Sequence, residues 1–112
     1  MKKIFALLAI ALSANAFAGN IEAGKAAAQK YNCASCHGAD FNSPVDPSYP
    51  KLAGQHADYL KHALKAYQRG GNAANGRGNA IMGGMAKPLS ATDIDDISAY
   101  LASLPGSLVL RK

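Results

Sequence analysis

One short segment constrains this chain more than any other, because it holds both cysteines of the sequence and a histidine. Cys33-Ala-Ser-Cys36-His37 separates two thiols by two residues and places an imidazole directly after the second thiol. This is the pattern of covalent c-type heme attachment. The two thiols add to the porphyrin vinyl groups as thioethers, and the adjoining imidazole can then ligate the iron. The sequence therefore predicts one covalently bound heme c, tethered by Cys33 and Cys36, with His37 as an iron ligand.

Two other uses of a Cys-x-x-Cys pair fit this chain less well. A thiol–disulfide exchange motif normally lies beside a βαβ unit, and no segment here alternates with period two over the length of a strand. A structural zinc site usually needs four nitrogen or sulfur ligands, whereas this chain offers two cysteines and three scattered histidines. Heme attachment is therefore the favoured interpretation.

Residues 1–18 have the pattern of a secretory signal peptide. Met1-Lys2-Lys3 is positively charged, residues 4–12 are almost continuously apolar, and Ala16-Phe17-Ala18 supplies the small residues that signal peptidase recognises. The apolar run is shorter than the roughly 20 residues that a spanning helix needs. We expect cleavage after Ala18, export to the periplasm, and a single domain over residues 19–112 with no membrane span.

The charge of the chain does not indicate a nucleic-acid partner. The formal net charge is +5, and two of these positive charges, Lys2 and Lys3, lie in the predicted signal peptide. The remaining chain is only mildly basic, which is far from the concentrated basic surface of a nucleic-acid-binding domain. We therefore expect no nucleic acid among its partners.

Apolar and small residues recur at helical spacing in three segments, and this predicts an all-α fold. The segments cover residues 21–31, 58–69 and 90–104. Ser90 and Asp93 fit a capping box at the start of the last helix, where Asp95 and Asp96 also suit the helix dipole.

The connections and the exposed charges are less informative. Residues 42–52 contain three prolines and predict a loop, and the glycine-rich residues 70–84 predict an irregular but ordered loop. Lys61, Lys65 and Arg69 recur every four residues on the second helix. A solvated face is the common explanation of such a pattern, and a docking rim for an acidic redox partner is the alternative.

The order and spacing of these motifs resemble the class I c-type cytochromes, especially short bacterial single-heme proteins and the single-heme halves of diheme periplasmic cytochromes. The similarity runs from about residue 21 to residue 104, and its blocks are residues 33–38, 49–55, 59–60, 82–90 and 93–101. The resemblance implies the class I cytochrome c fold, with about three main helices around one covalent heme. It also implies that Gly24 and Ala28 face the last helix.

The resemblance implies a methionine as the second axial ligand, on the segment before the last helix. In related short cytochromes this methionine lies seven residues before the leucine of the Leu-Ser pair that opens the helix. Here the pair is Leu89-Ser90, so Met82 is the predicted iron ligand. Met85 is then expected to be a packing residue near the heme edge. The apolar residues expected to line the heme pocket, with ordinary core packing as the alternative, are Leu52, Leu60, Leu64, Tyr67 and Leu89.

Further roles follow from the same resemblance. A ligating histidine usually donates its other ring N–H to a carbonyl or carboxylate. The family uses a proline carbonyl for this purpose, and counting along the matched block selects Pro47 for His37, with Pro50 as the alternative. Arg77 and Asn79 are candidates to bond a heme propionate, with solvent exposure as the other possibility. The two remaining histidines, at positions 56 and 62, are expected at the surface.

The implied function is periplasmic electron transfer on a His/Met-ligated heme c, without catalysis. A neutral thioether favours ferrous iron, and two protein ligands leave no iron position open for a substrate. The expected partners are a quinol-oxidising complex, a terminal oxidase or a periplasmic reductase. One alternative is a cytochrome subunit of a flavin-containing dehydrogenase complex, such as sulfide dehydrogenase. Another is a gas or redox sensor whose sixth ligand can be displaced.

Overall fold

The computed structural model describes residues 19–108, and the predicted signal peptide lies outside this range, as do residues 109–112. All regular secondary structure in the described part of the chain is helical, which confirms the predicted fold class. The helices are α1 (Ile21–Lys30), α2 (Ala34–His37), α3 (Ala57–Arg69), α4 (Ala80–Ala86) and α5 (Ala91–Ser103). The three long helices agree with the predicted segments to within about a residue at each end. The short helices α2 and α4 were not predicted.

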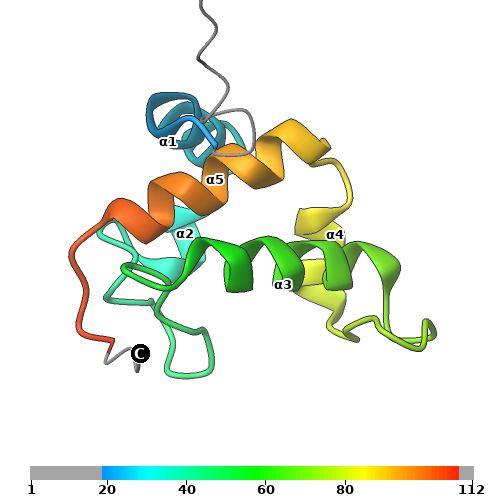
Figure 1. Ribbon diagram of the computed structural model, residues 1–112. Helices are drawn as coiled ribbons and strands as arrows, with labels where there is room; N and C mark the ends of the chain where they lie inside the picture. Colours follow the sequence, from blue (N-terminus) through cyan, green and yellow to red (C-terminus); the bar gives the residue numbers. More distant parts are fainter. Residues whose placement is uncertain (1–18, 109–112) are drawn as a thin grey trace, which may run out of the picture.

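The last helix, α5, is the central element of the fold and packs against both α1 and α3 (Figure 1). The contact with α1 is close because Gly24 faces α5. A Cβ atom at Gly24 would fall on the Asp96 carbonyl and lie 2.7 Å from Tyr100 Cβ. Ala28 is also buried, with 2% of its surface exposed. The predicted contact between the first and last helices is therefore confirmed, and it depends on small side chains.

Side-chain caps fix where α5 begins. Asp93 N donates to Ser90 Oγ over 2.9 Å, and Ser90 N donates to Asp93 Oδ2 over 3.1 Å, which completes the predicted capping box. The Tyr31 hydroxyl donates to the same Asp93 oxygen over 3.0 Å and so joins the end of α1 to the start of α5. These hydrogen bonds, led by the one from the Ser90 amide, lower the pKa of Asp93.

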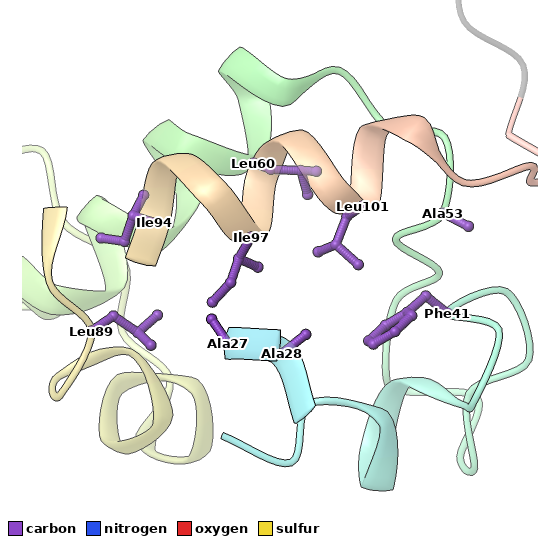
Figure 2. Close-up of a cluster of buried hydrophobic side chains, with 9 residues drawn as sticks. All are labelled: Ala27, Ala28, Phe41, Ala53, Leu60, Leu89, Ile94, Ile97 and Leu101. Carbon is purple, nitrogen blue, oxygen red and sulfur yellow. The ribbon is translucent and has the colours of Figure 1, made fainter. Parts of the chain in front are cut away.

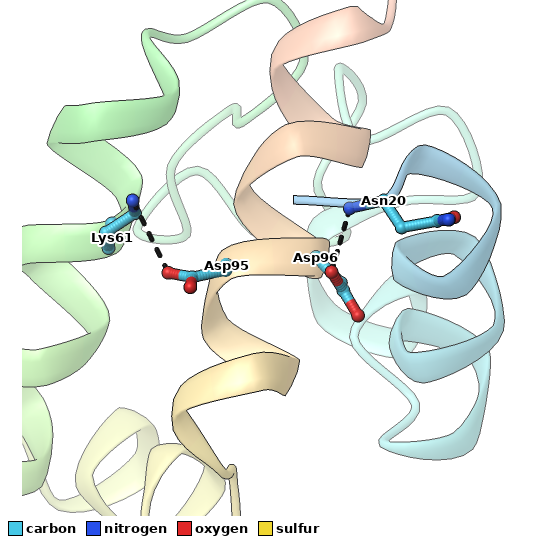
Figure 3. A network of polar contacts seen from close by, with 4 residues as sticks. All are labelled: Asn20, Lys61, Asp95 and Asp96. Atoms are coloured by element: carbon cyan, nitrogen blue, oxygen red, sulfur yellow. Dashed lines mark hydrogen bonds and ion pairs between the residues drawn. The ribbon is translucent and has the colours of Figure 1, made fainter. Parts of the chain in front are cut away.

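Two neighbouring aspartates connect α5 to its surroundings in opposite directions (Figure 3). Asp95 forms an ion pair with Lys61 of α3, with 3.4 Å between Oδ1 and Nζ. Asp96 Oδ1 accepts a hydrogen bond of 2.8 Å from the backbone N–H of Asn20, just before α1. These aspartates therefore have specific partners on both flanking elements, in addition to the favourable dipole position that the sequence indicated.

The buried hydrophobic cluster is small and lies along the inner side of α5. Figure 2 shows Ile97 and Leu101 of α5 pointing toward the alanines of α1, with Phe41 and Leu60 beside them. Three of the nine clustered residues are alanines, which contribute little apolar area. The members are Ala27, Ala28, Phe41, Ala53, Leu60, Leu89, Ile94, Ile97 and Leu101. Such a core leaves room for a further apolar group beside it.

No helix between residues 19 and 108 combines the length and the apolar character needed to cross a membrane.

Candidate functional site

A cavity of about 450 Å³ lies beside the buried cluster and is bounded by α2, the loop at residues 48–55, α3, residues 77–79, α4 and the inner side of α5. This volume falls in the usual range for small-molecule and cofactor sites. Four predicted site residues line it together: Cys33, Cys36, His37 and Met82. The fold thus brings the cysteine motif to the same cavity as a methionine that lies far away in the sequence.

A single helical turn places the motif residues. The backbone N–H groups of Cys36 and His37 both donate to the carbonyl of Cys33, over 3.3 and 3.1 Å, and α2 follows from residue 34. Residues three and four positions apart share one face of a helix, so both thiols and the imidazole face the cavity. The sequence contained this signal, because the spacing of Cys33, Cys36 and His37 is helical. The turn ends at Gly38, whose φ of 92° favours glycine.

The His37 ring is buried and held in one orientation. Only 6% of the residue is exposed, and Nδ1 lies 2.9 Å from the carbonyl oxygen of Pro50. Since a carbonyl only accepts, Nδ1 carries the proton and Nε2 keeps its lone pair for a metal. The prediction of Pro47 as the acceptor is wrong, and its alternative Pro50 is correct.

The reason for this difference is a tight turn in the loop. Tyr49 N donates to the Asp46 carbonyl over 3.0 Å, and Ser48 N donates to Asp46 Oδ1 over 2.8 Å. These bonds place Pro47 at the tip of the turn, where it is exposed. Counting along the sequence could not reveal which proline carbonyl would face His37.

Met82 lies in the first turn of α4 rather than in an irregular loop. Asn79 caps this helix, because its Oδ1 accepts a hydrogen bond of 2.9 Å from the backbone N–H of Met82 itself. The prediction of an irregular segment is therefore wrong for residues 80–84. The low helix propensity of two adjacent glycines made a helix unexpected here. The Asn79 cap and contacts with α3 stabilise it. Met85 also borders the cavity but is 38% exposed, so it packs less fully than expected.

The walls of the cavity are mainly apolar. Its lining includes every residue that was expected in the heme pocket, namely Leu52, Leu60, Leu64, Tyr67 and Leu89. Leu60 and Leu89 also belong to the buried cluster, so the cavity is continuous with the hydrophobic core. These walls provide an environment of low polarity for whatever the cavity holds.

Arg77 supplies a fixed positive charge at the cavity wall. Its Nη2 donates to the Tyr59 hydroxyl over 3.0 Å, and its guanidinium carbon lies 5.4 and 5.5 Å from the ring centroids of Tyr59 and Tyr67. The interactions with Tyr59 and then Tyr67 raise the pKa of Arg77. Two aromatic rings thus fix the guanidinium in place through cation–π contacts. Asn79, by contrast, uses its side-chain oxygen as the cap of α4.

The cysteine environment disfavours thiol–disulfide exchange. Burial is the main cause that raises the pKa of the Cys33 thiol. Reactive cysteines in exchange motifs have the opposite property, a lowered pKa that maintains the thiolate. The raised pKa of Cys33 therefore agrees with the absence of a βαβ pattern in the sequence, and both disfavour thiol–disulfide exchange.

The positively charged face of α3 is partly occupied by interactions within the chain. Lys61 pairs with Asp95, and Arg69 donates through Nε and Nη2 to the Asn75 carbonyl over 3.2 and 3.0 Å. This favours the solvated-face interpretation over a dedicated docking rim. His56 and His62 are exposed, as predicted.

The set of side chains around the cavity fits a heme. Two thiols suit covalent attachment, and an oriented imidazole and a thioether suit the iron. Apolar walls suit the porphyrin, and the cation of Arg77 suits its carboxylate substituents.

Comparisons with known proteins agree with this site. Residues 21–105 match the family model described as Cytochrome c. The chain is 39% identical over 115 residues to cytochrome c4 from Stutzerimonas stutzeri, with 96% of this chain and 53% of that protein covered. It is 45% identical over 75 residues to cytochrome c-554(548) from Halomonas halodenitrificans, with 63% of this chain and 82% of that protein covered.

A solved structure shares the same fold. The crystal structure of reduced recombinant cytochrome c4 from Pseudomonas stutzeri matches with a TM-score of 0.70 at 40% identity, over 81% of this chain and 48% of that one. The chain therefore spans about half the length of the cytochrome c4 proteins that it matches, and most of the length of cytochrome c-554(548).

Proposed function

The chain belongs to the cytochrome c family, and from this membership we propose that it is a periplasmic protein that carries one electron on a single His/Met-ligated heme c. One observation carries the proposal: two thiols, an oriented imidazole and a thioether from separate segments all line one apolar cavity. Family membership implies a covalently bound heme c, and this cavity is where the residues for it meet.

Each residue has a distinct role in the proposal. Cys33 and Cys36 tether the cofactor as thioethers, and the single turn of α2 fixes their separation. His37 presents Nε2 to the iron because its Nδ1–H is held by the Pro50 carbonyl. Met82 of α4 would provide a second iron ligand. The bound heme supplies a ferric/ferrous couple, and the apolar walls exclude water from it.

The proposed activity is transfer rather than catalysis. His37 and Met82 together would ligate the iron and leave no position open for a substrate. The pattern of residues 1–18 supports export to the periplasm, where the partners would be a quinol-oxidising complex, a terminal oxidase or a periplasmic reductase.

Spectroscopy of the full chain, expressed with the bacterial heme-ligation machinery, tests the proposal. We expect a periplasmic protein that keeps its heme in a denaturing gel, with a weak near-infrared sulfur-to-iron band in the oxidised state. Met82→Ala should remove this band, whereas Met85→Ala is the matched control and should retain it. A colourless product would contradict the proposal, and loss of the band only in Met85→Ala would contradict the assignment of Met82.

Two further measurements separate the proposed carrier from its rivals. A carrier purifies alone from the native periplasm, whereas a dehydrogenase subunit purifies with a stoichiometric flavin-containing partner. A sensor binds carbon monoxide rapidly in the ferrous state at neutral pH, whereas firm ligation by Met82 prevents this.

A further inference from the structure

Residues 77–89 form the segment that carries Met82, and hydrogen bonds attach both of its ends to α3. At the far end, Gln68 Nε2 donates to two backbone carbonyls, that of Ala86 over 2.9 Å and that of Leu89 over 2.8 Å. At the near end, the backbone N–H of Arg77 donates to the Ala66 carbonyl over 2.9 Å. The last turn of α3 therefore holds both the beginning and the end of this segment.

The segment needs such attachment because α4 is intrinsically weak. The helix has seven residues, and two of them are glycines. Short helices are marginal in water, and each internal glycine lowers helix stability relative to alanine. The carbonyls near the end of a helix also lack partners within the helix. A single half-buried amide, that of Gln68, donates to the Ala86 carbonyl, which also accepts from Leu89 N over 3.1 Å, and to the Leu89 carbonyl just beyond the helix.

We propose that Gln68 is a positioning residue for the axial methionine. Its two hydrogen bonds hold residues 86–89 on α3 and so oppose detachment of Met82 from the iron. The inference rests on the proposed function, in which Met82 is that ligand. Gln68 does not border the cavity, so it would act on Met82 only through the backbone of residues 86 and 89.

Competition with imidazole measures how firmly Met82 is held. Imidazole binds ferric iron only when the thioether has left, so its apparent affinity is proportional to the detached fraction. Gln68→Leu removes both hydrogen bonds, each of which makes a modest net contribution. We expect imidazole to bind the ferric holoprotein at least tenfold more tightly in this variant.

Matched variants make the test specific. Gln29→Leu introduces the same change on the exposed side of α1 and should leave imidazole affinity unchanged. Gln68→Glu keeps the shape but removes the donor, and it should behave as Gln68→Leu does; it serves in place of that variant if the latter fails to fold. In a Met82→Ala background, Gln68→Leu should have no further effect, because no thioether remains to detach.

The outcomes separate this inference from the proposed function. If Met82→Ala binds imidazole no more tightly than the wild type, Met82 is not the ligand and the ligand assignment of the proposed function fails. If Met82→Ala binds more tightly but both Gln68 variants match the wild type, only the inference fails. Lower thermal stability with unchanged imidazole affinity would likewise show that Gln68 is merely structural.

Discussion

His37 illustrates what single residues contribute to this site. The sequence identified it through the motif, but its orientation depends on a carbonyl thirteen positions away, that of Pro50. Neutral imidazole has one donor and one acceptor nitrogen, so the bond to the carbonyl determines which nitrogen can ligate a metal. The chemistry of this residue is therefore encoded locally, whereas its geometry comes from the loop at residues 46–50.

Arg77 yields a prediction at the same scale. A fixed positive charge near the iron favours the ferrous state, because it repels the additional charge of ferric iron. We expect Arg77→Gln to lower the reduction potential, as measured by redox titration of the purified holoprotein. Arg69→Gln is the matched control, since Arg69 is exposed and bonds only to the Asn75 carbonyl. Equal shifts in both variants would show a general charge effect instead of a role for Arg77.

The structure brings the predicted site residues together, whereas it corrects one predicted hydrogen-bond partner. Cys33, Cys36 and His37 follow from covalent chemistry that fixes their spacing, and the structure brings them to one cavity with Met82. The choice of Pro47 failed because a turn held by Asp46 reverses the chain at that point. The structure also reveals Gln68, for which the sequence contained no signal, because its partners are backbone carbonyls brought near by tertiary packing.

Among the helices, the crossing of α1 and α5 leads to a second prediction. Gly24→Ala would force a Cβ atom onto the Asp96 carbonyl and separate the two helices. We expect a loss of at least about 2 kcal/mol in the free energy of unfolding, measured by denaturant titration of the holoprotein. Gly84→Ala is the control, because a Cβ at that position meets nothing within 4 Å and alanine favours the helix. Comparable losses in both variants would contradict the close crossing.

The long helices were predictable because each has a clear apolar face and recognisable ends. The capping box of α5, for example, is written in Ser90 and Asp93, and both of its hydrogen bonds form. The helix α4 was not predictable from propensity, since Gly83 and Gly84 lie at its centre. It forms because Asn79 caps one end and Gln68 holds the other, and the second of these contacts appears only in the folded chain.

For the whole molecule, the main feature is a small core next to a large cavity. The largest fully buried side chain among the described residues is Ile94, and much of the apolar surface inside the fold lines the cavity instead. A domain of this size gains proportionally little from burial alone, so a covalently attached group adds a substantial share of its stability.

Loss of the covalent heme attachment should therefore impair folding as well as remove the visible heme absorption. We expect the variant with Cys33→Ser and Cys36→Ser together to lose much of its helical circular dichroism and to be cleaved rapidly by protease. Lys25→Gln, a change at an exposed position of α1, is the control and should leave both properties as in the wild type. A double-serine variant that remained fully helical and resistant to protease would show that the polypeptide folds unaided.

The hydrogen bond between Asn20 and Asp96 joins residues 76 positions apart, and Tyr31 reaches Asp93 across 62. In the proposed export, the amino end of the chain crosses the membrane first, so α1 and the cysteine turn emerge well before α5. During that interval Gly24 lacks the surface of α5 on which it packs, and the two thiols remain accessible on an unfolded chain. We expect the heme-attachment enzymes to form the thioether bonds during this interval. The packing of α5 then completes the fold after the heme is attached.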